Sequence, residues 1–432
     1  MEKFTQLHCH SVFSIYDGLS SVSGIIDKAV EKGHEAVALT DHGSMSGLLK
    51  FQQAALKKGI KPILGSEFYI VNGISGDDKI RKNNHIILLA ENETGYKNMC
   101  YLNNISNEED HFYYKPRITF DELFQNKEGI FISSACLASG FANLIKKGKE
   151  KEAEELFDRF CKEFGENFSA ELQLNETNFP ELAQKDYNAW LINIANKKGV
   201  PLIITGDCHY LNPTDAEVQE LMFRIKSKED SASGEQRFAC HTLYYHGIDD
   251  YKKFNKAFGY NYSDEFIESC CANAYDIGKK CNYIIPERTK MLLPRQAFDE
   301  DQKLVEEAKK GLERKFKCSY KDCPKEYRDR LEEEIRIMIK KGMARYLLCL
   351  QDIVNYCKNN DIDLGVGRGS AAGSLVCSCL GIVHESIDAL KANLIFSRFV
   401  SEERLPTIVI DYSKSGNRLG EKWTKQHQKE KL

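Results

Sequence analysis

The sequence lacks several features that mark particular classes of protein. It has no apolar stretch approaching the roughly 18 residues that a membrane helix needs, and no secretory leader, so we expect neither a membrane nor an exported protein. It also lacks an excess of positive charge, because 60 basic residues face 64 acidic ones and leave a formal net charge of -4. Any contact with nucleic acid must therefore be local.

The cysteines do not form a disulfide framework of the secreted kind. All 15 are scattered through strand-like and helix-like runs, so we expect reduced thiols in a cytoplasmic enzyme. With 432 residues and a hydrophobic fraction of 42%, the chain is long enough for two or three domains with real cores.

The first half alternates short apolar runs with helical patterns. Five runs have the length and composition of buried strands: Phe4–Leu7, Ala36–Leu39, Ile86–Leu89, Ile130–Ile132 and Leu202–Ile204. Between the first two, apolar residues recur with a 3.6-residue period from Val22 to Val30, and Gly33 is a natural helix terminator. This pattern predicts an α/β fold of parallel strands wrapped by helices, and the reactive residues beside several strands favour a barrel.

The second half turns helical and highly charged from about Glu265 onward. Amphipathic helices are expected at Tyr327–Met343 and Leu347–Lys358, in a mostly helical or α+β unit. We place a first domain at 1–285 and a second unit at 286–412. A basic tail at 413–432 has little to bury and is expected to fray.

Two short motifs place pairs of metal-ligand side chains on one side of the backbone. His8 and His10 are two residues apart, so in an extended segment both imidazoles point the same way. Asp207 and His209 repeat this spacing after a predicted strand, and His42 follows another. The carboxyl ends of several strands therefore carry donors that could share ions.

Four further residues complete the candidate set: Asp17, Glu67, His85 and Cys136. A mixture of nitrogen, carboxylate and thiolate donors suits zinc or manganese better than magnesium, and two or three ions are plausible. The alternative is that these are satisfied, partly buried side chains, and a lone cysteine such as Cys136 is usually a small core residue. Cys9 and Cys208 alternate with the donors and are expected to pack on the opposite side.

This donor pattern resembles the PHP (polymerase and histidinol phosphatase) domain. The resemblance implies a distorted seven-stranded β/α barrel with a trinuclear metal centre. It assigns the ligands of the first ion as His8, His10, Glu67 and Asp207, those of the second as Glu67, His85 and Cys136, and those of the third as Asp17, His42 and His209.

Such a centre is expected to hydrolyse phosphoesters, because bound ions acidify a coordinated water and neutralise phosphoryl oxygens. With DNA as substrate, the resemblance implies a 3'-to-5' proofreading exonuclease. Two alternatives stay open. One is a stand-alone phosphatase acting on a small phosphomonoester, and the other is a non-catalytic module that docks replication proteins and uses its metals for stability.

A glycine-rich segment lies near the end of the chain, at 363–376. Its glycines allow close approach to a ligand, and the arginine and serine side chains can bond phosphate; the candidates are Gly367, Arg368, Gly369, Ser370 and Ser374. A close-packed structural turn is the alternative reading of this segment by itself.

The same segment resembles the triphosphate-binding palm motif of the alpha subunit of bacterial DNA polymerase III. Segments 91–96, 113–117 and 341–355 also resemble that family. The resemblance implies DNA replication, with primer-template DNA and deoxynucleoside triphosphates as substrates, magnesium in a completed palm, and other replisome subunits as partners.

The family's carboxylate motif Pro-Asp-x-Asp-x-Asp is incomplete in this chain. Its counterpart runs from Pro406 to Asp411, with Val409 in place of one catalytic aspartate and only Asp411 retained as a catalytic candidate. Two-metal nucleotidyl transfer needs paired carboxylates. We therefore expect a partial palm that does not polymerise by itself, belonging to a fragment or to a split gene whose companion polypeptide completes it.

Overall fold

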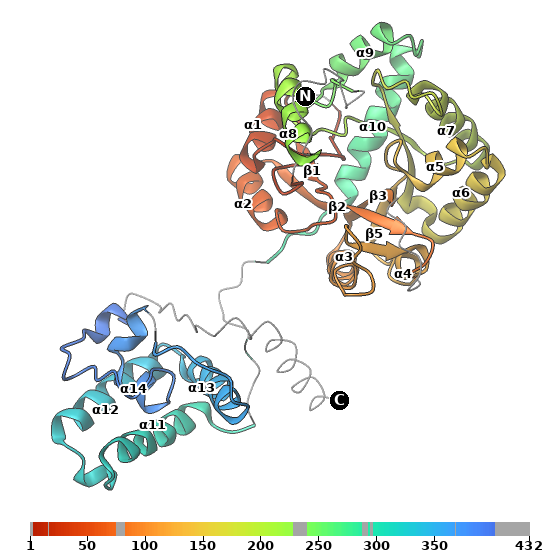
Figure 1. The fold of residues 1–432 in the computed structure, drawn as a ribbon. Coiled ribbons are helices and arrows are strands. Elements are labelled where there is room, and N and C mark those ends of the chain that lie inside the picture. Colours follow the sequence, from red (N-terminus) through yellow and green to blue (C-terminus); the bar gives the residue numbers. More distant parts are fainter. Residues whose placement is uncertain are drawn as a thin grey trace. The chain divides into compact units, whose positions relative to one another are not determined.

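The computed structural model describes residues 3–15, 17–74, 83–227, 240–286, 293, 297–367 and 369–401. Its internal contacts divide the chain into two compact units, Met1–Glu287 and Arg288–Leu432 (Figure 1). Among the described residues, no helix is both long enough and apolar enough to cross a membrane.

The first unit is built on a curled seven-stranded sheet. Its strands are β1 (Ala36–Leu39), β2 (Lys61–Val71), β3 (Asn84–Ala90), β4 (Arg117–Thr119), β5 (Ile130–Ser133), β6 (Phe168–Gln173) and β7 (Leu202–Thr205). The spatial order is β1-β2-β3-β5-β6-β7, and the short β4 pairs with β2. Nearly every strand position is buried, as expected for a sheet covered by helices.

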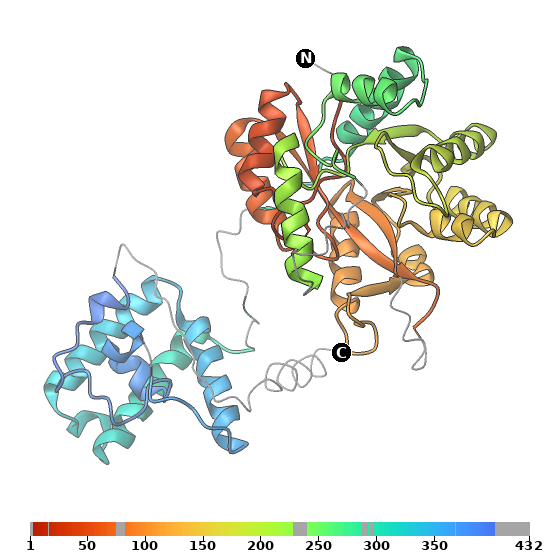
Figure 2. The same ribbon diagram turned by 45° about the horizontal axis from the view of Figure 1, so that its top comes forward.

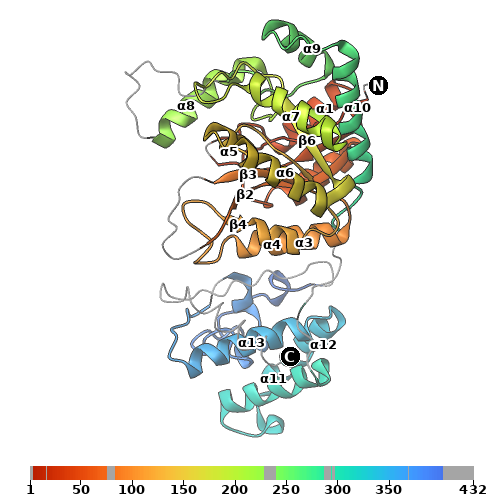
Figure 3. The ribbon, with the colours of Figure 1, turned by 90° about the vertical axis from the view of Figure 1, so that its right-hand side faces the viewer.

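Helices surround this sheet, as Figures 1 and 2 show. They are α1 (Val22–Glu31), α2 (Leu48–Lys58), α3 (Glu93–Ile105), α4 (Phe120–Gln125), α5 (Gly140–Lys146), α6 (Glu150–Phe164), α7 (Gln184–Lys198), α8 (Ala216–Ser227), α9 (Ile248–Ala257) and α10 (Asp264–Lys280). Figure 3 shows α6 and α7 running beside β6. The apolar core fills the layer between strands and helices.

Helix α1 illustrates how the sequence specifies these elements. It buries Val22, Ile25, Ile26 and Ala29 on one face, and the Ser21 hydroxyl accepts a hydrogen bond from the backbone of its first turn. The chain leaves the helix through a glycine at φ 72°, as the periodicity predicted.

The prediction of parallel strands is wrong at β3. This strand runs antiparallel to both of its neighbours, β2 and β5, whereas β1–β2, β5–β6 and β6–β7 are parallel. An apolar run reports burial on both faces but carries no information about strand direction. The direction of β3 therefore could not be read from its composition.

The N-terminal segment joins the two ends of the sheet. Gln6 bridges to Val37 of β1, and Cys9 bridges to Cys208 just beyond β7. The predicted strand Phe4–Leu7 thus makes isolated bridges in place of a continuous ladder. Since both edge strands are engaged through this segment, the predicted barrel-like α/β architecture is confirmed, in distorted form.

In its described residues the second unit is helical, without strands. Its helices are α11 (Glu300–Phe316), α12 (Lys325–Lys340), α13 (Ala344–Asn359) and the short α14 (Leu375–Cys379). Both predicted amphipathic helices are present as α12 and α13. Helix α11 crosses α14 at close range, because a Cβ on Gly311 would lie only 2.1 Å from the carbonyl oxygen of Cys379.

Candidate metal centre

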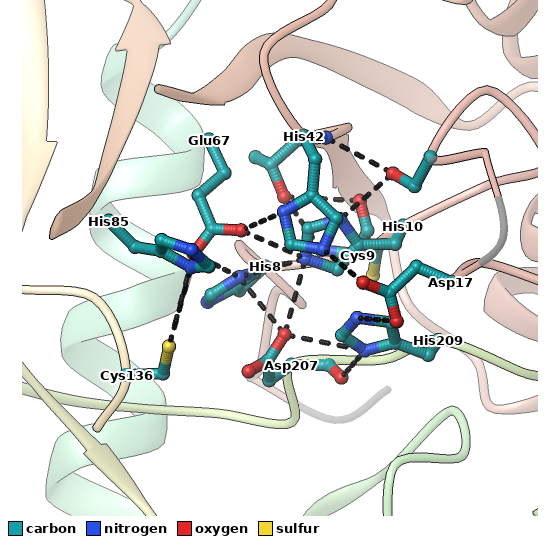
Figure 4. Close-up of polar contacts among 12 residues, drawn as sticks. His8, Cys9, His10, Asp17, His42, Glu67, His85, Cys136, Asp207 and His209 are labelled. Atoms are coloured by element: carbon teal, nitrogen blue, oxygen red, sulfur yellow. Dashed lines mark hydrogen bonds and ion pairs between the residues drawn. The ribbon is translucent and has the colours of Figure 1, made fainter. Parts of the chain in front are cut away.

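Both histidines of the first motif, His8 and His10, point toward the acidic and imidazole side chains of the other candidate ligands (Figure 4). Their segment lies beside the chain that follows β7: the Cys208 amide donates to the His8 carbonyl at 3.0 Å, and the His10 amide donates to the Cys208 carbonyl at 2.7 Å. Cys9 and Cys208 are buried in the core, as predicted. The pairing aligns two donor motifs that lie about 200 residues apart in sequence.

The backbone of the second motif, Asp207 to His209, is not fully extended. Asp207 has φ 47°, in the left-handed region that non-glycine residues rarely adopt, and so does Ala135 at φ 56°, directly before Cys136. Such backbone costs on the order of 1–3 kcal/mol and is concentrated at functional sites. Here it coincides with two candidate ligands from different strand ends.

The chain following β1 runs beside β2 and brings His42 against Glu67. These two residues form a parallel bridge, and the Gly43 amide donates to the Glu67 carbonyl at 2.7 Å. Glu67 lies in the middle of β2, not at a strand end as most of the other candidates do. Asp17 approaches from its own loop, with Oδ2 at 3.1 Å from His42 Nε2 and Oδ1 at 3.4 Å from His209 Nε2.

All nine predicted ligands meet in this one pocket. The donor atoms of seven of them fall into three overlapping groups, each with its atoms within 4.8 Å of one another: His8, His10 and Asp207; His10, His42 and His209; and His42, Glu67 and His85. In the first group Asp207 Oδ1 lies 3.1 Å from His8 Nε2 and 3.2 Å from His10 Nε2. These groups overlap with the predicted ligand sets but do not reproduce them residue for residue.

Cys136 lies at the edge of the second predicted set. Its Sγ is 3.9 Å from His85 Nδ1 and 4.0 Å from Glu67 Oε1, while His85 Nδ1 is 2.9 Å from the same Glu67 oxygen. Burial raises the pKa of the Cys136 thiol well above its usual value. A bound cation would favour the thiolate, which is the form that coordinates metal.

Four buried atoms of the pocket make no well-aligned hydrogen bond, although oppositely charged or ring atoms lie against them: Asp17 Oδ1, His42 Nδ1, Glu67 Oε2 and Asp207 Oδ1. Native proteins rarely bury several polar atoms together without hydrogen bonds of good geometry. Atoms that carry lone pairs and face a common space are suited to a cation. The donor set therefore fits divalent metals, with mixed nitrogen, oxygen and sulfur ligands.

Charge in the pocket also favours a cation. Burial alone would lower the pKa of His42, but the carboxylates of Glu67 and Asp17 raise it to about 10. Burial would raise the pKa of Glu67, yet His85 and His42 hold it well below its usual range. The carboxylates thus stay ionised and draw positive charge, which protons supply when no metal is bound.

The sequence analysis missed Glu171, which supports the site from behind. This buried residue of β6 accepts hydrogen bonds from His8 Nδ1 at 2.7 Å and Thr205 Oγ1 at 2.6 Å, and also from the Ser133 hydroxyl. The bond to Nδ1 leaves Nε2 of His8 with a free lone pair toward the ligand cluster. The available signal for this strand was the alternation of apolar residues with polar ones, among them Glu171 and Gln173.

Asp41 has a similar supporting role. Its carboxylate accepts from the Ser11 amide at 2.6 Å and from the Ser14 hydroxyl at 2.7 Å, and Ser14 Oγ lies 3.1 Å from His10 Nδ1. Burial raises the pKa of Asp41. The ring of His10 is thereby oriented through Ser14, with Nε2 directed to the cluster.

The cluster opens into a cavity of about 1190 Å³. Asp17, His42, His85, Cys136, Asp207 and His209 line it, together with basic and aromatic side chains from neighbouring loops. A volume of this size exceeds what the ions alone would fill, so the cavity can admit a ligand beside them.

In the second unit, Gly367 (φ 123°) and Gly369 (φ 78°) are exposed and adopt conformations that favour glycine. Gly367 lines a cleft of about 1080 Å³, along with Arg314, Lys317 and Lys358. Ser370 is half-buried at the start of a 3₁₀ turn. This part of the turn is open to an anionic ligand.

Ser374, which was expected to bind phosphate, is not open to a ligand. It is fully buried, and its hydroxyl donates to Glu334 at 2.8 Å while capping α14. The Val376 amide donates to the same carboxylate at 3.0 Å. The first turn of α14 is thus already occupied by a side chain of α12. Arg368, Val409 and Asp411 lie outside the described residues.

Two family models match the chain in succession. The PHP domain matches residues 6–175, and the bacterial DNA polymerase III alpha NTPase domain matches residues 302–422. The first match includes seven of the nine candidate ligands and ends before Asp207 and His209.

Curated relatives match almost the whole chain. DNA polymerase III subunit alpha of Aquifex aeolicus is 35% identical over 430 residues, covering 95% of this chain and 36% of the relative. The Borreliella burgdorferi subunit is 34% identical over 421 residues, covering 96% and 35%. The chain therefore spans about a third of the length of these relatives.

Solved structures resemble a smaller part. An amidohydrolase from Chromobacterium violaceum covers 48% of this chain and 87% of its own, with 16% identity and a TM-score of 0.31. The family assignment accordingly rests on the sequence matches. By its PHP domain, its NTPase-domain match and its identity to these relatives, the chain belongs to the DNA polymerase III alpha subunit family, whose N-terminal part it matches.

Proposed function

We propose that the first unit binds two or three divalent cations, zinc or manganese, through the nine clustered side chains. The observation that carries this proposal is the convergence of seven of these side chains into three overlapping groups, in each of which the potential ligand atoms lie within 4.8 Å of one another. Domains 1–285 and 286–412 then correspond to a metal-dependent phosphoesterase and a partial polymerase palm.

We further propose that this centre hydrolyses phosphodiesters at the 3' end of a DNA strand during replication. Metal ions, when bound, acidify a water nucleophile and neutralise the phosphoryl oxygens. Residues of the chain orient the candidate ligands: Glu171 fixes the ring of His8, and Ser14 fixes the ring of His10. The cavity beside the cluster provides space for the strand end.

The test uses purified chain, manganese and a primer with a mismatched 3' nucleotide. Release of 3' nucleotides is expected with manganese, and is expected to fall by several orders of magnitude in Asp17→Asn and His209→Ala variants. Metal content measured by mass spectrometry accompanies each assay. A chain that holds its metals and releases nothing from the primer would remove the exonuclease proposal.

For the second unit we propose triphosphate binding at the turn around Gly367 and Gly369, as the family resemblance implies. The exposed glycines and the basic side chains of the adjoining cleft support it. Magnesium and a companion polypeptide would be needed for nucleotidyl transfer, since Val409 replaces one metal-binding aspartate of the family motif.

We therefore expect no primer extension by this chain alone. The assay supplies primer-template DNA, all four deoxynucleoside triphosphates and magnesium, with an Asp17→Asn background to suppress degradation. Because paired carboxylates are required to hold the ions between primer and triphosphate, no extended product should accumulate. Processive synthesis by the isolated chain would contradict this expectation.

A further inference from the structure

The cavity at the metal centre has a rim whose composition differs from the ligand cluster. Outside the nine candidate ligands, the described lining residues include four cations, Lys115, Arg117, Lys146 and Lys147, against a single carboxylate, Glu181. Two exposed aromatic side chains, Tyr114 and Phe179, line the same cavity. Metals alone would suffice to anchor one phosphate, so this rim requires another explanation.

Tyr114 lies at the tip of a loop that is closed by hydrogen bonds. Tyr113 and Lys115 form a bridge around it, their neighbour Arg117 is buried, and Arg117 Nε donates to the His111 carbonyl at 2.9 Å. Tyr114 itself is 61% exposed and has φ 58°, which a bulky residue rarely adopts. The loop thus presents an aromatic ring to the cavity from a fixed backbone.

Two of these cations, Lys115 and Lys146, contact neutral groups at the cavity. Lys115 Nζ donates to the Tyr69 hydroxyl at 2.8 Å and lies 4.7 Å from the centre of that ring. Lys146 Nζ donates to the Leu137 carbonyl at 2.6 Å and lies 5.9 Å from the ring of Phe179. Each ammonium therefore lies beside an aromatic ring that lines the cavity.

A rim that combines cations and aromatic rings matches the chemistry of an unpaired polynucleotide. Bases stack on aromatic side chains, and lysines follow the phosphates, whereas a small phosphate ester offers nothing for the exposed rings to contact. Duplex DNA keeps its bases stacked inside the helix and could not use them either. The rim thus favours a single strand.

Building on the exonuclease function proposed above, we propose that Tyr114, Phe179, Lys115 and Lys146 form a strand-binding rim that selects an unpaired DNA end over a small phosphate ester. The two rings stack on bases, and the two ammonium groups contact the phosphates that precede the scissile linkage. These residues determine specificity and take no part in the chemical step.

Binding is measured with the full chain, manganese and a 5'-fluorescein oligothymidylate whose 3' linkages are phosphorothioates, by fluorescence anisotropy. Tyr114→Ala and Phe179→Ala should each weaken binding roughly 5- to 100-fold, the range for losing one stacked base. Lys115→Gln should reduce the slope of log affinity against log salt by about 0.7, one phosphate contact on a single strand.

Matched controls lie elsewhere on the same unit. Tyr101 is 52% exposed on α3 and Lys151 is exposed on α6, and neither lines the cavity, so Tyr101→Ala and Lys151→Gln should bind like the parent. Tyr114→Phe and Lys115→Arg keep the ring and the charge and should retain binding. Thermal melting of each variant separates lost binding from lost folding.

A second arm compares kcat/KM for the unmodified oligonucleotide with that for ethyl p-nitrophenyl phosphate. Their ratio should fall at least fivefold in Tyr114→Ala. If the cavity variants bind and cleave with the parent's selectivity, the proposed role of the rim is wrong. If the metal-loaded parent cleaves neither substrate, the exonuclease proposal fails, while the anisotropy measurements still decide whether the rim binds a strand.

Discussion

The imidazole of His8 is fixed between two kinds of partner. Its Nδ1 donates to the buried Glu171, and its Nε2 faces Asp207 at 3.1 Å. A carboxylate behind a metal-binding histidine sets the ring tautomer and raises the basicity of the coordinating nitrogen. Glu171 therefore acts on the centre without belonging to the ligand set.

Replacing this carboxylate should weaken metal binding while leaving all nine donors in place. The Glu171→Gln variant keeps the shape of the side chain but loses its charge and places an amide donor among four other donors. We expect the affinity for manganese or zinc to fall by roughly 10- to 100-fold. Competition with a chromophoric chelator measures the change.

The chain offers a matched control for this substitution. Glu122 accepts from His111 Nε2 at 2.8 Å, so Glu122→Gln also breaks a histidine–carboxylate pair, but outside the metal centre. Its metal affinity should equal that of the parent. Equal affinities in Glu171→Gln and the parent would show that the ring of His8 needs no such support.

The candidate ligands could be predicted from the sequence more readily than the residues that orient them. The His8–His10 and Asp207–His209 spacings, together with the family resemblance, identified all nine residues that the structure brings together. Glu171 escaped because strand β6 was not recognised, so the alternation of polar and apolar residues at Phe168–Gln173 was not used. Residues that orient the ligands can be recognised only when the pairing of the strands is known.

At the scale of elements, regular apolar patterns were the reliable guide. Strand β1 and helix α1 agree with their predicted ranges to within one residue, because each has an uninterrupted pattern. Strand β2 was missed since Pro62, Gly65 and Glu67 interrupt it. The antiparallel course of β3 could not be predicted either, because direction depends on how the chain returns and not on composition.

Glu334 connects three elements of the second unit. From α12 it accepts from Arg330 Nε at 2.6 Å, from the Ser374 hydroxyl and from the Val376 amide. In Glu334→Gln one side of the carboxylate becomes an amide donor facing a buried donor, which costs roughly 1–3 kcal/mol. The thermal midpoint of the second unit should fall on the order of 5 °C.

Calorimetry measures this shift, and the neighbouring Glu333→Gln serves as its control. Glu333 is exposed on the same helix, so its replacement should change the midpoint by less than about 1 °C. A Glu334→Gln variant as stable as the parent would mean that α14 is held to α12 by apolar packing alone.

For the whole molecule, the division into two compact units predicts two unfolding transitions. Metal bound to the first unit should stabilise that unit only, by roughly 2.7 kcal/mol at a free concentration 100 times Kd. Chelation should therefore lower the midpoint of one transition by on the order of 5 °C and leave the other unchanged.

The Glu334→Gln variant identifies which transition belongs to the second unit. Scans of the parent with manganese and with a chelator, repeated on this variant, should move different transitions. A single transition that responds to both perturbations would contradict independent units, and no response to chelation would contradict metal binding by the folded chain.

The bridge between Cys9 and Cys208 has a consequence for how the protein is made. Two histidines that emerge early from the ribosome cannot meet Asp207 and His209 until about 200 more residues have been synthesised, which takes roughly 10 to 40 s. Throughout that interval two of the nine candidate ligands are missing. Assembly of the proposed metal centre is therefore a late event in the synthesis of this domain, because it depends on the segment that follows the last strand, β7.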